Sequence, residues 1–440
     1  MEKVVYIVHA IDTEGPLFES TSESFKRLEN YFNIKVEPTL ENLNKIQNKQ
    51  LDFGGFEEQA AKILSPQFLN YIDDYHKLNK MLDNITSERF RMQLPDSFGN
   101  GWLYSWHCVD HLDYDYNPRR KDIGMHNIFD FYADYIFQHN LKDEIHWHYH
   151  PSHHSRASHF NATNYLIDTK FFKILAHRII ERGWFPSVNR CGFHVERPDS
   201  HWILEQWIPY DLSNQAIDEE SEQLDLAGGR FGDWRRAPKS YGVYHPHHDD
   251  YQIEGSCRRV IGRCLNIGTR MRCITQNIVN DVFEEAQNKG KALIGITDHD
   301  FRDMAPDVNQ MRSFIKNAAT KYPNVKFKYC DSREAFNLFM HGKHEKPNEN
   351  ILSLKLEKFG DQGQMRLKVN ANEPTFGPQP FLAIKLKSGA IHYSNFDFQK
   401  PFFEWTYVFD KQTFEIDLVE TIGVASNDKK GFPHVVRINP

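Results

Sequence analysis

Three histidines alternate along a short stretch of the chain. The segment Glu144–Pro151 reads Glu-Ile-His-Trp-His-Tyr-His-Pro, so His146, His148 and His150 are spaced two residues apart. Side chains at alternate positions of a β-strand project from the same face, and Pro151 favours a turn directly after the strand. Three imidazoles on one face of a strand end are typical of a site for a divalent metal ion.

Two carboxylates follow an apolar run near the N-terminus. Asp12 and Glu14 come shortly after Val4–Val8 and are two residues apart, which places them on one side of a strand end. Carboxylates combined with imidazoles form a mixed oxygen and nitrogen site, which suits Zn²⁺ or another divalent transition metal better than Ca²⁺ or Mg²⁺. The sequence therefore predicts a metal-dependent hydrolase, with His153 and His154 as further candidate ligands.

Two more strand-like segments end in polar groups. An apolar segment that starts at Leu293 ends in Asp298, His299 and Asp300. Flanking carboxylates would fix the tautomer of this imidazole and raise its pKa, so His299 is a predicted general acid. Arg190 closes another strand-like segment, where its guanidinium could orient a catalytic carboxylate.

Short apolar strands alternate with amphipathic helices from residue 1 to about 340. The strand-like segments are Val4–Ile11, Trp102–Val109, Glu144–Tyr149, Pro186–Arg190, Ala292–Thr297 and Val325–Tyr329. Apolar residues with helical spacing begin at Phe171, Val279 and Val308. Repeated strand–helix units predict an α/β fold with a mainly parallel sheet, either open or closed into a barrel.

Two regions depart from this alternation. Residues 17–100 are rich in Glu, Asn, Lys and Gln and contain helical stretches such as Phe68–Leu82, which predicts an insertion on the face where α/β active sites are built. Residues 344–350 read as a linker, and period-two alternation with regular turns follows it. We expect a barrel unit over 1–345 and a small all-β accessory domain, an antiparallel β-sandwich, over 351–440. The aromatic run Phe402–Phe409 is expected to be a core strand rather than a carbohydrate platform.

Charge and composition exclude several classes of partner. The net charge is −7 at pH 7, which gives no general attraction to nucleic acid or to anionic membranes. The sequence has no apolar run of about 18 residues and no basic-then-apolar leader at its start. Its six cysteines form no Cys-x-x-Cys pair, which fits reduced thiols. We expect a cytoplasmic protein with no nucleic-acid partner and no membrane span; the oligomeric state stays open.

Taken in chain order, these segments resemble the motifs of the polysaccharide deacetylase family, which are metal-dependent carbohydrate esterases. The family's motifs are an acidic pair, two metal-binding histidines, an arginine before glycine with a later Tyr-Asp-x-Ser segment, and a histidine after an apolar strand. The matching segments here are, in that order, Asp12-Thr-Glu14, His148-Tyr-His150, Arg190-Cys-Gly192 with Tyr210-Asp-Leu-Ser213, and Thr297-Asp-His299-Asp300. The resemblance covers roughly residues 3–340.

This resemblance implies a fold, a reaction and a role for each residue. The fold is a distorted (β/α) barrel with the metal at the C-terminal mouth. The reaction is hydrolysis of the amide bond of an N-acetylated sugar or saccharide precursor, so carbohydrate is the expected substrate. The implied ligands of a divalent metal, with Zn²⁺ as the expected ion, are Glu14, His148 and His150. The implied catalytic residues are Asp12 as general base, Arg190 as the group that positions it, and His299 as general acid.

The sequence departs from the family pattern in its first two motifs. Glutamate replaces the second aspartate and a threonine intervenes, so the division of base and ligand between Asp12 and Glu14 stays open. The family commonly spaces its two histidines by four residues, and His146 and His154 each have that spacing from His150.

Two other functions also stay open at this point. One is a catalytically silent barrel that binds a carbohydrate or a protein partner. The other is a two-metal phosphoester hydrolase that uses His/Asp-rich segments such as His245–Asp250. For a carbohydrate ligand, Trp102, Trp106 and Trp147 are candidates for stacking on sugar rings.

Overall fold

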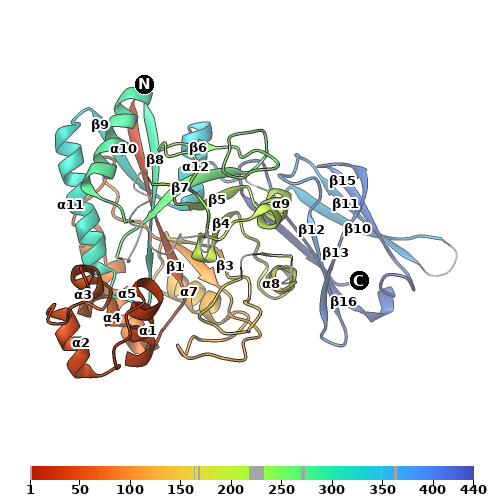
Figure 1. The fold of residues 1–440 in the computed structure, drawn as a ribbon. Helices are drawn as coiled ribbons and strands as arrows, with labels where there is room; N and C mark the ends of the chain where they lie inside the picture. The colour runs from red at the N-terminus through yellow and green to blue at the C-terminus, as the bar shows by residue number, and fades with distance from the viewer. Residues whose placement is uncertain are drawn as a thin grey trace.

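A computed structural model describes residues 2–162, 164–166, 169–217, 232–268, 273–347, 349–360 and 364–440. Its centre is a ring of parallel strands (Figure 1). In order around the ring these are β1 (Lys3–Thr13), β2 (Ser105–Val109), β3 (Glu144–Tyr149), β4 (Val188–Cys191), β5 (Tyr210–Asn214), β7 (Val260–Asn266) and β8 (Lys291–His299). Because β8 pairs again with β1, these described strands form a closed seven-stranded barrel.

Two further strands extend the ring. The short β6 (Val243–Tyr244) pairs antiparallel with β7, and β9 (Val325–Cys330) pairs parallel with the first half of β1. The closed parallel barrel confirms the expectation of a parallel α/β fold. The sequence did not predict β5 and β7 as strands.

The first strand is buried on both faces, as strands of parallel barrels generally are. Val5 and Ile7 face outward and share a core with α10 (Gln276–Lys289) and α11 (Ala305–Lys321). Val8 and Ala10 face the barrel interior, where α12 (Ser332–His341) contributes Phe336 to their core. Since side chains alternate along a strand, Asp12 falls on the interior face, at the end where β1 leaves the barrel.

The remaining barrel helices follow β2, β3 and β4. They are α7 (Asn127–Gln138), α8 (Lys170–His177) with a π-helical turn η1 (Arg178–Arg182), and α9 (Pro198–Trp207), which a 3₁₀ turn η2 (Gly192–His194) precedes. The apolar face predicted from Phe171 belongs to α8, and those predicted from Val279 and Val308 belong to α10 and α11.

Six helices occupy the described insertion between β1 and β2. They are α1 (Thr21–Phe32), α2 (Leu40–Gln47), α3 (Glu57–Ile63), α4 (Pro66–Leu69), α5 (Tyr75–Thr86) and α6 (Glu88–Arg91). The backbone N–H of Phe18 donates to the Arg119 carbonyl and that of Ile72 donates to the Phe301 carbonyl, so the insertion lies against the loops that follow β2 and β8. The expected continuous helix over Phe68–Leu82 is wrong, because Asp74 caps the start of a new helix by accepting from the Lys77 N–H.

The described residues after the linker form two four-stranded antiparallel sheets, drawn in blue in Figure 1. One contains β10 (Leu352–Lys358), β11 (Met365–Ala371), β15 (Glu404–Phe409) and β14 (Asp397–Lys400). The other contains β13 (Ile391–Ser394), β12 (Phe381–Leu386), β16 (Val419–Asn427) and β17 (Pro433–Ile438), and a 3₁₀ turn η5 (Ile416–Leu418) precedes β16. Both sheets contribute to one hydrophobic core, which includes Trp405, Tyr407 and Phe409, so the aromatic run is core strand as expected.

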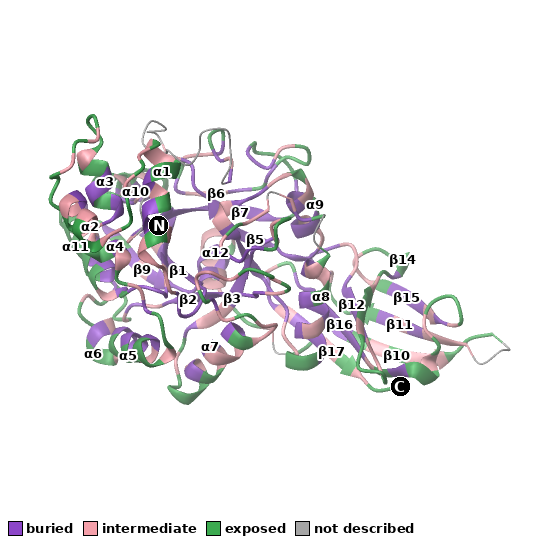
Figure 2. Ribbon diagram, turned by 60° about the horizontal axis from the view of Figure 1, so that its bottom comes forward, coloured by how far each residue is buried: buried purple, intermediate pink, exposed green. Residues whose placement is uncertain are grey.

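An apolar interface joins the barrel to these sheets. Phe381 of β12 packs against Trp207 at a ring-centroid distance of 5.4 Å, and Phe172 of α8 stacks on Tyr393 of β13 at 4.4 Å. The side-chain amide of Asn427 donates to two barrel carbonyls, including that of Trp207, at 2.8 Å each. Figure 2 shows buried residues continuing from the barrel into the neighbouring sheet. The linker is therefore not the sole connection between the two parts.

We expect a protease to cut within residues 344–350 and to leave the two pieces associated. Burial of aromatic side chains contributes roughly 25 cal/mol per Å² of apolar surface, which favours the joined state even after the chain is cut. Limited proteolysis followed by size-exclusion chromatography, with and without mild denaturant, measures this. Separation into two folded pieces without denaturant would show that the interface contributes little.

None of the helices in the described ranges is long and apolar enough to cross a membrane.

Candidate metal centre

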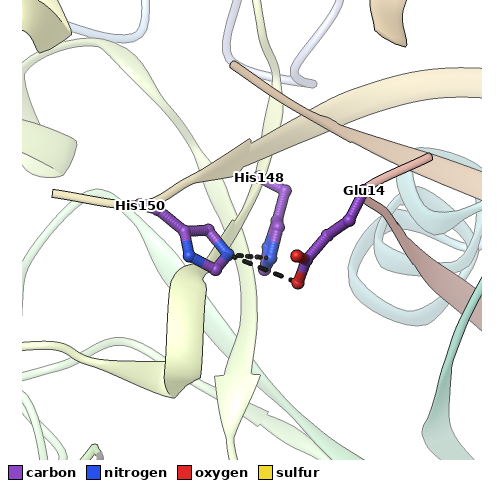
Figure 3. Close-up of side chains that lie close together, drawn as sticks. All are labelled: Glu14, His148 and His150. Atoms are coloured by element: carbon purple, nitrogen blue, oxygen red, sulfur yellow. Dashed lines mark hydrogen bonds and ion pairs between the residues drawn. The ribbon is translucent and has the colours of Figure 1, made fainter. Parts of the chain in front are cut away.

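The carboxyl ends of β1 and β3 bring three buried ligand groups together. His148 Nε2 and His150 Nε2 lie 2.7 Å apart, and His150 Nε2 is 3.9 Å from Glu14 Oε1. Figure 3 shows the two rings and the carboxylate converging on one point. All three residues are at most 6% exposed, and their donor atoms all lie within 4.8 Å of one another. The group could hold a metal ion, as the sequence predicted.

Strand alternation aims the two imidazoles. Trp147 and Tyr149 occupy the outer face of β3, where both rings contact Phe171 of α8, so His148 faces the barrel interior and His150 follows on the same side. His148 Nδ1–H donates to the Arg190 carbonyl at 2.8 Å. This hydrogen bond fixes the tautomer and leaves the lone pair of Nε2 directed at the site, which is the arrangement a metal ligand requires.

Glu14 is held by its backbone and by its side chain. The N–H groups of Glu14 and Gly15 donate to the two carboxylate oxygens of Asp300 at 2.9 Å each, and the Tyr132 hydroxyl donates to Asp300 at 2.8 Å. The buried Lys121 ammonium binds Glu14 Oε2, which leaves Oε1 facing the imidazoles. Burial raises the pKa of Glu14, but the Lys121 ammonium and the neighbouring imidazoles, His150 first among them, together hold that pKa well below its usual range.

Asp12 lies beside this group with its own partners. Arg190 Nε donates to Asp12 Oδ1 at 2.5 Å, while Arg190 Nη1 donates to the Leu212 carbonyl at 2.9 Å. The other carboxylate oxygen, Oδ2, is 3.7 Å from His299 Nε2. Burial raises the pKa of Asp12, but the Arg190 guanidinium and the His148 and His299 imidazoles together lower it by more, so that the carboxylate stays ionised. The structure thus brings Asp12, Arg190 and His299 together as the sequence predicted.

The predicted raised pKa of His299 is wrong. Burial lowers the pKa of this imidazole to about 4, even though Asp12 and Glu14 raise it. Its chain neighbours do not hold the ring, because Asp298 accepts from the backbone N–H of His299 at 2.7 Å and Asp300 binds the backbone of Glu14. At neutral pH the resting His299 is therefore uncharged.

The two alternative histidines have other positions. His146 lies deeper in the barrel, where its Nε2 is 2.7 Å from Asp331 Oδ2. His154 is exposed in the loop after β3. In the described part of the chain, neither shares the group formed by Glu14, His148 and His150.

The backbone beside His150 is tightly fitted. A Cβ on Gly192 would lie 2.4 Å from His150 Cδ2, so the ring needs a glycine at this position. The next two residues, Phe193 and His194, have positive φ angles of 50° and 54°, a conformation that costs energy in non-glycine residues and occurs often at functional sites. The Phe193 ring contacts the His150 ring at a centroid distance of 5.5 Å.

We expect Gly192→Ala to weaken metal binding about tenfold or more, because the added methyl group must displace the His150 ring. Calorimetric titration of the metal-free protein with Zn²⁺ measures the effect, and circular dichroism checks the fold. Gly242→Ala is the control, because the atom nearest to its added Cβ is 3.5 Å away. Gly290→Ala is unsuitable as a control, because the φ angle of Gly290 is positive. Unchanged Zn²⁺ affinity in Gly192→Ala would argue against His150 as a ligand.

Sequence reasoning missed two residues in the loop after β2, Lys121 and His111. The sequence of this loop has no helical or strand periodicity. The one feature that could have pointed to these residues is that the loop directly follows a barrel strand, where α/β barrels place their active sites. The proposed stacking role of Trp102, Trp106 and Trp147 is excluded, because all three are at most 1% exposed.

Other polar clusters in the described residues have different neighbours. Cys191, Glu196 and Asp211 lie close together, but Arg259 binds Glu196 and is 3.5 Å from Asp211, so a cation already occupies that space. The His245–Asp250 segment joins no group that could hold a metal in the described ranges, and its Asp250 pairs with Arg236 at 2.7 Å.

No protein-family model matches the chain, and no curated protein sequence matches it. Its class is defined by its own structure: a closed parallel α/β barrel, joined to two antiparallel sheets, with one glutamate and two histidines at the strand ends that could hold a metal ion.

Proposed function

We propose that this protein is a metal-dependent hydrolase that removes the acetyl group from an N-acetylated sugar, as the polysaccharide deacetylases it resembles do. The proposal rests on one observation: a group of metal-ligand side chains and a separate acid–base pair lie side by side at the strand ends. Glu14, His148 and His150 form one ligand group, while the ionised Asp12 stands beside it between Arg190 and His299. A purely structural metal site would need no such neighbouring carboxylate and imidazole.

The donor set fits Zn²⁺. Two imidazoles and a carboxylate are the three protein ligands of many catalytic zinc sites, which keep further positions open for water and substrate. The fixed tautomer of His148 and the carbonyl that holds it are also usual around such ions. When bound, the ion polarises a carbonyl group and lowers the pKa of water toward neutrality.

Asp12 and His299 supply the proton transfers in this mechanism. Arg190 occupies Oδ1 of Asp12, so Oδ2 is the oxygen that takes a proton from the attacking water. His299 Nε2 lies 3.7 Å from that oxygen and is uncharged at rest, so it can receive this proton and pass it to the departing amine. The low pKa of His299 suits a group that releases its proton readily.

An acetate-release assay tests the proposal. Zn²⁺-loaded protein is incubated with N-acetylglucosamine oligosaccharides of increasing length, and free acetate is measured against metal-stripped protein. We expect acetate release that depends on the metal. A phosphodiester substrate serves as the comparison: hydrolysis of the phosphodiester alone, or one bound metal with no acetate released from any N-acetylated sugar, would refute the proposal.

A further inference from the structure

His111 is a buried imidazole at the rim of the metal centre that the mechanism above does not use. It lies two residues beyond the end of β2, and β2 pairs with β3 so that Val109 is opposite His148. Continuing that register places His111 beside His150. The ring centroids of His111 and His150 are 6.2 Å apart.

Neither ring nitrogen of His111 has a hydrogen-bond partner among the described residues, although the side chain is only 1% exposed. Buried polar groups in native proteins are nearly always paired, so an unpaired one beside a functional site calls for a ligand. The two interior histidines of β3 do have partners: His148 binds the Arg190 carbonyl and His146 binds Asp331.

The position of His111 is fixed by the backbone. The Gly124 N–H donates to the His111 carbonyl at 2.8 Å within a short β-bridge, and the Tyr114 ring lies 6.1 Å from the imidazole. The backbone of His111 is therefore anchored at the rim, and its imidazole lies beside the His150 ring.

His111 stands farther out than the metal ligands do. The His148 and His150 rings are 4.6 Å apart, and His111 lies outside the group whose donor atoms are all within 4.8 Å of one another. A zinc ion held by three protein ligands keeps positions open. The 6.2 Å between the His111 and His150 rings puts the imidazole of His111 close enough to contact a molecule bound at such a position.

We propose that His111 donates a hydrogen bond to the acyl oxygen of the substrate, an inference that rests on the proposed function. As water adds to the carbonyl carbon, the C=O π electron pair moves onto this oxygen, and it returns when the C–N bond breaks. A fixed donor stabilises the negative charge that develops there. His111 keeps its proton throughout, and an imidazole carries an N–H in either protonation state. Lys121, the other buried donor of this loop, is bound to Glu14 Oε2.

The test uses three variants of His111 and two probes. His111→Ala removes the donor, while His111→Asn and His111→Gln place an amide near the positions of Nδ1 and Nε2. The first probe is acetate release from an N-acetylglucosamine oligosaccharide. The second is binding of the acetate ion itself to Zn²⁺-loaded protein, which needs no turnover. Zn²⁺ affinity is measured for each variant.

We expect His111→Ala to lower kcat about 10²–10³-fold and to weaken acetate binding about tenfold, with Zn²⁺ affinity within about twofold of the wild type. At least one of the two amide variants should recover tenfold in kcat. His9→Gln is the control, since His9 is buried with an unpaired Nε2 but packs against Trp102 on the outer face of β1. That variant should change none of the readouts.

Three results would overturn the role of His111. A tenfold loss of Zn²⁺ affinity in His111→Ala would show that His111 is a metal ligand. Unchanged kcat and unchanged acetate binding in that variant would show that His111 is only a core residue. If neither His111→Asn nor His111→Gln recovers kcat, His111 does not act as a hydrogen-bond donor. If the wild type binds Zn²⁺ and acetate but releases no acetate from N-acetylated sugars, the deacetylase proposal fails, and the acetate-binding comparison alone decides whether His111 contacts an acyl oxygen.

Discussion

Replacement of Asp12 with asparagine is expected to lower turnover by about 10²–10⁴-fold while Zn²⁺ stays bound, because general acid–base groups typically contribute that much. Asparagine has nearly the same shape but cannot take a proton at the position of Oδ2. His299→Ala should have an effect of the same order, since it removes the group that receives this proton. Steady-state acetate release and metal analysis on the same preparations measure both quantities.

The pH dependence of kcat/KM is a second test of Asp12 as the general base. Arg190 lowers the pKa of this carboxyl against the effect of burial, so the base is ionised at neutral pH and becomes protonated only under acidic conditions. We expect kcat/KM to fall on the acid side. In Arg190→Gln this acid-side fall should begin at a higher pH, because one of the groups that lower the pKa of Asp12 is lost. Loss of Zn²⁺ in Asp12→Asn would instead make Asp12 a ligand and transfer the role of base to another acid.

His148→Ala and His150→Ala are each expected to abolish stoichiometric metal binding with little loss of the fold. Each replacement leaves two of the three donors, and neither histidine belongs to the hydrophobic cores that hold the barrel together. Elemental analysis after dialysis against micromolar Zn²⁺ gives the metal content per chain. His154→Ala is the matched control, because it removes an exposed histidine four residues from His150.

One result would contradict the assignment of His148 and His150 as metal ligands. If both single variants retain one metal per chain, the ion is bound elsewhere. Two other groups in the described part of the chain would then be the alternatives, since the donor atoms of each also lie within 4.8 Å of one another: His126, His177 and Glu181, and Glu144, His146 and Asp331.

The parts of this centre that the sequence predicted share one property. Asp12, His148 and His299 each follow or end an apolar run that is recognisable as a strand by itself, so chain order was sufficient to place them at one end of a barrel. The direction of the His299 pKa could not be predicted, because it depends on burial by distant segments rather than on the two neighbouring aspartates.

The strands that the sequence missed are stabilised by distant partners. β5 carries Asp211 and Ser213, and β7 carries Arg263, all of them buried. Such residues do not read as a parallel barrel strand. Asp211 is acceptable there because Asn189 of β4 donates to it at 2.9 Å, and this partner is known only once the fold is known.

The ion pair between Lys121 and Glu14 has a consequence for charge balance. Two carboxylates, Asp12 and Glu14, face two cationic side chains, Lys121 and Arg190, and their formal charges cancel. A divalent ion added to this neutral set leaves an excess of positive charge in a buried site, where screening is weak. Such a centre attracts anions. We therefore expect the acetate product to stay bound and to inhibit the proposed reaction, whereas the protonated amine product is repelled.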